Sequence, residues 1–193
     1  MVLPDGGQGA LEAIERQSRA PDDLVTGGEP DRQADWFWLV DGSVLPEPTA
    51  LERLLEALER LGPLPAPALL ASKVVTRDGS LDPGSAPVPD IRSIDVAVAA
   101  YQQGVVAVRI ARRGSLLVRR PLAGADVVWT ARLLKRELGL LVPGSVAVRS
   151  TPRERAPLRE RVALLCSDAL ELREKPWFVL RLTEDAVGGL RDR

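Results

Sequence analysis

The chain contains no histidine among its 193 residues, and it contains a single cysteine. The absence of histidine excludes a Ser-His-Asp triad, a histidine general base and a histidine-ligated metal site. Any chemistry must therefore use carboxylates, hydroxyls or arginines. The lone Cys166 excludes an intramolecular disulfide, and its place in an apolar helical pattern predicts a buried free thiol in a reducing compartment.

Long hydrophobic runs are also missing from the chain. No stretch approaches the roughly 18 apolar residues of a membrane-spanning helix, and the first residues lack the basic start and apolar core of a signal peptide. These absences predict a cytoplasmic protein without a transmembrane segment.

Charge of either sign is not in excess. The formal net charge is -1, so nucleic acid is not an expected partner. Apolar residues make up 45% and charged residues 27% of the chain, which is typical of a globular protein. The length suits one sizeable core rather than two domains. We therefore expect one domain over residues 1–150 and a C-terminal helical extension over residues 151–193, packed on the core or on a partner.

Hydrophobic periodicity predicts strands that alternate with helices, which favours an α/β fold with a mostly parallel sheet flanked by helices. Val105–Ile110 and Ser115–Arg119 are predicted to form a hairpin across the turn between them. The other predicted strands are Trp36–Val40, Ala68–Val75 and an interrupted Leu140–Val148; the predicted helices are Ala10–Gln17, Thr49–Leu61, Asp126–Leu138 and two beyond Pro157.

The strand over Trp36–Val40 ends in Asp41, Gly42 and Ser43. An apolar run that stops at an acid and a glycine predicts a buried strand with a carboxylate at its C-terminal end. Open α/β sheets bind their ligands at that edge. Two simpler interpretations remain: Asp41 as a turn residue ahead of Gly42, and the aromatic side chains of Trp36–Trp38 as core packing, which is favoured over sugar stacking.

This strand, its acid and the Leu-rich helix that follows resemble the inverting, nucleotide-sugar-dependent family 2 glycosyltransferases of the GT-A fold. The family usually carries Asp-x-Asp there, whereas Ser43 stands at the place of the second acid. The resemblance covers roughly residues 10–150. Residues 124–132 resemble the helix start that carries the family's catalytic base, with Ala125 replacing the first acid, and Arg149 stands where the family often has a histidine.

The resemblance implies a nucleotide-sugar donor with UDP, GDP or dTDP as the nucleotide. Asp41, Gly42 and Ser43 would bind the donor, Asp41 would hold Mg²⁺ or Mn²⁺, and Asp126 would be the catalytic base. An inverting transfer uses a cation to neutralise the leaving diphosphate and a carboxylate to deprotonate the acceptor. Mg²⁺ can be held by one carboxylate together with phosphates and water. The alternative for Asp126 is a helix N-cap.

Two functions follow from these patterns. The first is a bacterial glycosyltransferase that acts on an unknown acceptor; the second is a catalytically inactive, glycosyltransferase-like binding or assembly protein, because the acidic motifs are degenerate. The amphipathic segment 177–182 can pack on the core, on a second subunit of a homodimer or, as a membrane-peripheral protein, on a lipid surface. The arginines of the predicted hairpin, at 109, 112, 113, 119 and 120, form either a solvated face or a site for a diphosphate or an anionic lipid carrier.

Overall fold

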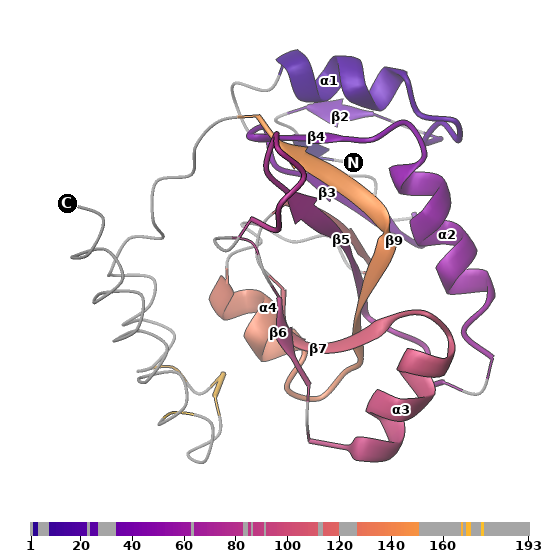
Figure 1. Ribbon diagram of the computed structural model, residues 1–193, viewed down its shortest axis with the longest axis vertical. Helices are drawn as coiled ribbons and strands as arrows, with labels where there is room; N and C mark the ends of the chain where they lie inside the picture. Colours follow the sequence, from indigo (N-terminus) through magenta and orange to yellow (C-terminus); the bar gives the residue numbers. More distant parts are fainter. Residues whose placement is uncertain are drawn as a thin grey trace.

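The protein is an α/β structure built around a seven-stranded sheet (Figure 1). The structure is a computed structural model that describes residues 2–3, 8–22, 24–26, 34–62, 64–82, 85, 87–90, 92–111, 114–119, 127–150, 167, 169–170 and 175. Its helices are α1 (Gln8–Glu15), α2 (Ala50–Glu59), α3 (Ile94–Gln102) and α4 (Val127–Leu133); its strands are β1 (Val2–Leu3), β2 (Val25–Thr26), β3 (Phe37–Val40), β4 (Val44–Pro46), β5 (Leu69–Val75), β6 (Val88–Pro89), β7 (Val106–Ile110), β8 (Ser115–Val118) and β9 (Gly139–Arg149).

The sheet has the order β3-β8-β5-β9-β7-β6, and β4 pairs with the end of β9. Within the described sheet β5 and β9 pair in parallel, while every other pairing is antiparallel. The prediction of α/β structure is confirmed, but the prediction of a mostly parallel sheet is wrong. Apolar periodicity reports which side chains are buried, and it is the same whichever way a neighbouring strand runs.

The predicted hairpin of β7 and β8 is also wrong. The two strands lie apart in the sheet, with β9 and β5 between them. All four residues of β8 are buried, and buried backbone groups need hydrogen-bond partners on both sides. β8 finds these partners by lying between β3 and β5 instead of at a hairpin.

The pairing places the ends of three strands at one edge of the sheet. β3 and β5 are both antiparallel to β8, so they run in the same direction, and β9 runs parallel to β5. The C-terminal ends of β3, β5 and β9 therefore meet at the same edge. After β3 the chain turns, and β4 pairs antiparallel with the last residues of β9.

Apolar side chains on both faces of the sheet pack into separate clusters. On β3, Trp38 and Val40 join a cluster with Leu54 of α2, whereas Phe37 joins a second cluster with Leu134, just after α4. Successive residues of a strand point to opposite faces, which accounts for this division. The sheet is thus covered by helices on both sides, as Figure 1 shows for α2 and α4. Core packing of Phe37 and Trp38, the favoured interpretation, is confirmed by their burial.

A chain of buried hydroxyl groups crosses the sheet. The Trp38 indole N–H donates to Ser115 Oγ (2.9 Å), which bonds to Ser72 Oγ (2.7 Å). Ser72 Oγ bonds in turn to Ser145 Oγ (2.7 Å), which donates to the Ala50 carbonyl at the start of α2 (2.8 Å). Ser145 lies where the register of β5 and β9 shifts, which confirms the predicted interruption of the last strand. These bonds tie β3, β8, β5, β9 and α2 together.

The predicted helix over 126–138 is shorter in the structure, because α4 ends at Leu133 and turns follow it. The predicted site residue Asp126 lies outside the described residues, and so do Cys166 and most of the C-terminal extension. The helices expected beyond Pro157 therefore stay predictions.

Candidate functional site

Asp41 lies at the C-terminal end of β3, at the edge where three strands end. Its backbone N–H donates to the Gly114 carbonyl (2.7 Å), which continues the pairing of β3 with β8. Its Oδ1 accepts hydrogen bonds from the backbone N–H of Ser43 (2.9 Å) and from Ser43 Oγ (2.7 Å). This geometry is an Asx turn, in which the aspartate side chain accepts a hydrogen bond from the backbone two residues later and so mimics a backbone turn. Asp41, Gly42 and Ser43 are all partly buried there.

The guanidinium of Arg149 lies directly behind this turn. Arg149 is the last residue of β9 and pairs with Val44, the first residue of β4. Its Nη1 donates to Ser43 Oγ, the same oxygen that donates to Asp41. The Ser43 hydroxyl therefore stands between the carboxylate of Asp41 and the positive charge of Arg149.

On its other side Arg149 forms an ion pair with Asp82. Its Nε and Nη2 both lie 3.0 Å from Asp82 Oδ2. Nη2 also donates to Ser85 Oγ, which donates to Asp82 Oδ2 (2.8 Å). Arg149 is 5% exposed and Asp82 is 6% exposed. We call these five residues, Asp41, Ser43, Asp82, Ser85 and Arg149, the Arg149 cluster.

Two members of the Arg149 cluster were not predicted from the sequence. Asp82 and Ser85 lie in the segment 81–90, which carries three prolines and no helix or strand pattern, and Asp82 is 67 residues from its partner Arg149. The short pattern of an acid followed three residues later by serine was the signal available. Such a pattern is too common in loops to identify a buried ion pair.

The Arg149 cluster does not fit a divalent cation bound through Asp41 and Ser43. A cation bound to Asp41 Oδ1 would lie one hydroxyl group away from the Arg149 guanidinium, and like charges at such short range repel each other. Over the described ranges, no three Asp, Glu, His or Cys side chains gather closely enough to hold a metal ion. Asp41 and Ser43 thus form a turn that is hydrogen-bonded to the buried ion pair of Arg149 and Asp82.

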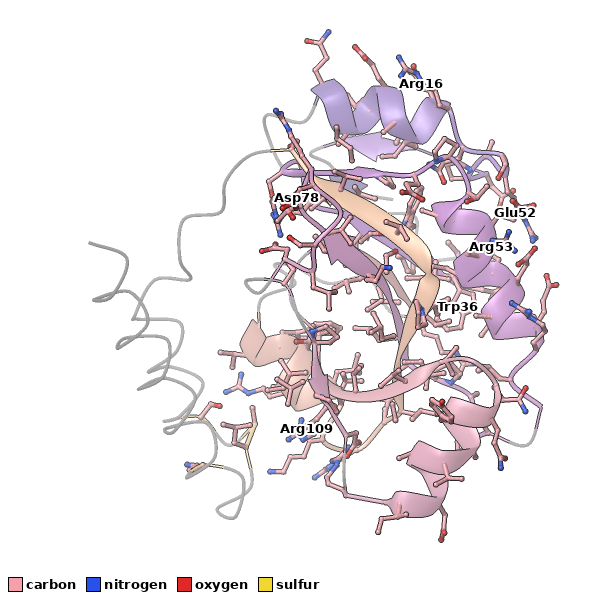
Figure 2. All side chains as sticks on the ribbon, in the orientation of Figure 1. Arg16, Trp36, Glu52, Arg53, Asp78 and Arg109 are labelled. Atoms are coloured by element: carbon pink, nitrogen blue, oxygen red, sulfur yellow. The ribbon has the colours of Figure 1, made fainter. Side chains whose placement is uncertain are left out.

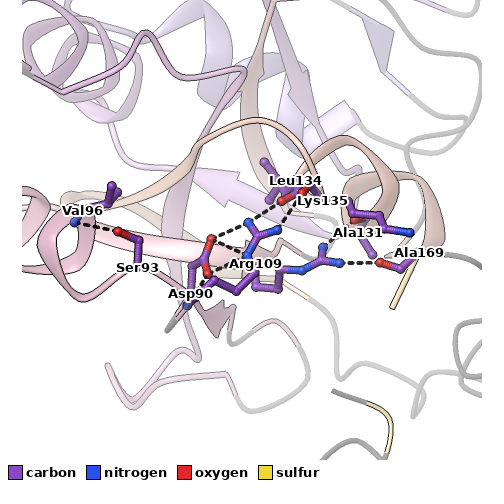
Figure 3. A network of polar contacts seen from close by, with 9 residues as sticks. Asp90, Ser93, Val96, Arg109, Ala131, Leu134, Lys135 and Ala169 are labelled. Atoms are coloured by element: carbon purple, nitrogen blue, oxygen red, sulfur yellow. Dashed lines mark hydrogen bonds and ion pairs between the residues drawn. The ribbon is translucent and has the colours of Figure 1, made fainter. Parts of the chain in front are cut away.

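Arg109 does not belong to a solvated basic face, as the hairpin prediction allowed. Its side chain is buried, at 2% exposure, and its Nη groups donate to the carbonyls of Ala131 and Ala169. Figure 3 shows the guanidinium between these two carbonyls. Arg109 thus links β7 to α4 and to residue 169. Figure 2 shows Arg109 far from Asp78, which lies in the turn after β5.

The remaining arginines of that predicted face are divided. Arg119 is exposed, and its guanidinium lies 5.8 Å from the centre of the Trp36 ring, which is a cation–π geometry. Arg112, Arg113 and Arg120 lie outside the described residues.

A second polar region surrounds a cavity of about 340 Å³ beside the N-terminus of α3. Arg92 pairs with Asp90 and donates to the carbonyls of Leu134 (2.7 Å) and Lys135 (2.7 Å). Figure 3 shows Asp90, which precedes α3, facing Leu134 and Lys135 in the turns after α4. Arg92 therefore fastens two segments to each other, and its charge is already compensated by Asp90.

The Asp90 pair makes stability depend on pH. Burial opposes ionisation of Asp90, but hydrogen bonds and the charge of Arg92 outweigh it and hold the pKa of Asp90 below its ordinary 3.8. A pKa that is lower in the folded state gives stability that is present above about pH 4 and is lost as the pH falls.

We expect Asp90→Asn to destabilise the protein at pH 7, with a difference from the natural protein that shrinks below about pH 4. Urea unfolding from pH 7 to pH 2.5 measures this difference. A difference that stays constant over the whole range would contradict the assignment to the ionised pair.

Comparison with models of known protein families finds no match, and comparison with curated protein sequences finds none either. Statements about function therefore rest on the residues and their geometry. In the part of the chain that the structure describes, no helix is long and apolar enough to span a membrane.

Proposed function

We propose that the protein is a glycosyltransferase-like protein that binds a nucleotide-sugar donor at the edge where β3, β5 and β9 end, and transfers the sugar to an acceptor. The observation that supports it is the position of Asp41. This carboxylate follows a buried strand at the edge where open α/β sheets bind ligands. In this proposal Gly42 and Ser43 contact the donor with Asp41, and Asp126 accepts the proton of the acceptor hydroxyl.

A second candidate is a binding or assembly protein of the same fold without turnover. The Arg149 cluster favours it, because both hydrogen bonds of Asp41 Oδ1 go to Ser43 and the neighbouring positive charge is already paired with Asp82. In this candidate the same edge recognises a ligand, and no carboxylate there acts on it.

A homodimer formed through segment 177–182 stays a prediction. Light scattering coupled to size-exclusion chromatography measures the mass of the protein in solution and so tests for the dimer.

Calorimetric titration with UDP-, GDP- and dTDP-sugars tests both candidates. Saturable binding of one nucleotide sugar followed by release of its nucleoside diphosphate in the presence of acceptors supports transfer. Binding without release supports the second candidate. No binding at millimolar donor would contradict a donor site of either kind.

The variant Asp41→Asn should weaken donor binding at least about tenfold and leave the melting temperature nearly unchanged, because asparagine keeps the side-chain oxygen that Ser43 needs. The matched control is Asp78→Asn. Asp78 accepts similar hydrogen bonds from Thr76 and Ser80 in the exposed turn after β5, and these bonds lower the pKa of its carboxyl. Loss of stability without loss of binding would identify Asp41 as a turn residue only.

A further inference from the structure

We infer that the Arg149 guanidinium takes the place of a divalent cation at the edge where β3, β5 and β9 end, so that this edge binds its ligand without a metal ion. The sequence predicted Mg²⁺ or Mn²⁺ at Asp41. The structure instead puts a fixed cation, carried by β9, one hydroxyl away from Asp41.

The arrangement of the Arg149 cluster resembles a coordination shell built around a guanidinium. Asp41 with Ser43 lies on one side, and Asp82 with Ser85 lies on the other. Each serine hydroxyl accepts from a different Nη atom and donates to its own carboxylate. Carboxylates and hydroxyls are also the oxygen ligands that Mg²⁺ and Mn²⁺ prefer. Asp82 and both serine hydroxyls therefore contact the Arg149 guanidinium directly, and Asp41 is joined to it through the Ser43 hydroxyl.

Burial holds the Arg149 guanidinium in this position. Arg149 is 5% exposed and its partner Asp82 is 6% exposed, so the guanidinium cannot swing into solvent to admit an ion without breaking the pair. A guanidinium carries five N–H donors in one plane, so the single Arg149 side chain contacts Ser43, Ser85 and Asp82 together. Arg149 is thus a positioning residue that sets the orientation of Ser43 and Asp41 and supplies positive charge behind them.

Measurement of Mn²⁺ binding tests directly whether the Arg149 guanidinium takes the place of a divalent cation. Electron paramagnetic resonance of free Mn²⁺, titrated with the full chain, should show no binding tighter than about 1 mM, the weak end of protein sites for divalent ions. Arg149→Ala removes the charge and leaves space beside Asp41 and Asp82, so its Mn²⁺ affinity should rise at least about tenfold. Arg149→Lys keeps a positive charge and should stay as weak as the natural protein.

The double variant Arg149→Ala with Asp82→Asn identifies the ligands. Loss of one carboxylate should return Mn²⁺ affinity to that of the natural protein. Mn²⁺ should also raise the melting temperature of Arg149→Ala and leave that of Arg149→Lys unchanged, a readout that an arginine with only a structural role would not produce.

Binding of Mn²⁺ to the natural protein at micromolar concentration, lost in Asp41→Asn, would overturn the inference, and this measurement needs no variant of Arg149. Failure of Arg149→Ala to gain any Mn²⁺ affinity while folded would also overturn it. The consequence for the donor rests on the proposed function: nucleotide-sugar affinity should be the same with Mg²⁺ and with EDTA. Absence of donor binding under both conditions would contradict the proposed function alone, because the Mn²⁺ measurements do not involve a donor.

Discussion

Arg149→Ala should lower the free energy of unfolding by about 3–5 kcal/mol, the usual cost of removing one partner from a buried ion pair. The loss comes chiefly from Asp82, whose buried carboxylate would keep its hydrogen bond from Ser85 Oγ but lose the Arg149 guanidinium. The cost is smaller than the stability of most domains of this size, so the variant should still fold. Urea unfolding at pH 7, followed by far-ultraviolet circular dichroism, measures it.

The matched control for Arg149→Ala is Arg77→Ala. Arg77 lies at the same edge of the sheet and donates to the Ser150 carbonyl (2.8 Å), but it is exposed, so its loss should cost less than about 1 kcal/mol. The double variant Arg149→Met with Asp82→Leu should recover part of the lost stability, because it removes both charges of the buried pair. A cost for Arg149→Ala as small as that for Arg77→Ala would mean that the ion pair is solvated.

Trp38→Ala should cost about 3–5 kcal/mol, because it removes a large buried ring from the core between the sheet and α2. Trp38 is 3% exposed and lies in the cluster with Val40, Leu54 and Leu70. The variant also removes the donor to Ser115, and so breaks the chain of buried hydroxyls at one end. Circular dichroism is the suitable probe, since tryptophan fluorescence changes with the substitution itself.

Two further variants separate the ring of Trp38 from its N–H group. Trp38→Phe keeps most of the apolar surface and should cost about 1–2 kcal/mol for the lost hydrogen bond. Trp36→Ala, at the half-buried neighbour that stacks on Arg119, should cost less than Trp38→Ala. Loss of nucleotide-sugar binding in Trp38→Ala at unchanged stability would instead support sugar stacking, the interpretation that burial disfavours.

Several elements were predictable from the sequence because their signals are local. The predicted strand over Trp36–Val40 contains β3, the predicted strand over Ala68–Val75 contains β5, and the predicted helix over Thr49–Leu61 contains α2. Each has an apolar period that depends only on neighbouring residues. Gly62, which has a positive φ of 52°, lies two residues after Arg60, the C-cap of α2.

The arrangement of these elements was not predictable in the same way. The antiparallel insertion of β8 between β3 and β5 joins segments that are far apart in the sequence, and a period-two strand accepts a neighbour of either direction. The predicted hairpin was wrong for this reason. Local turn residues favoured it, but the burial of β8 on both faces and its need for partners on both edges decided against it.

The candidate site shows the same division between local and distant determinants. The sequence by itself determined that Asp41 follows a buried strand, that no histidine takes part, and that Ser43 rather than a second acid stands beside it. Only the tertiary structure decided that Arg149, 106 residues from Ser43, closes on that turn and pairs with Asp82. A buried charge must be compensated by whichever group the fold brings within contact distance, and that distance depends on strand pairing rather than on sequence spacing.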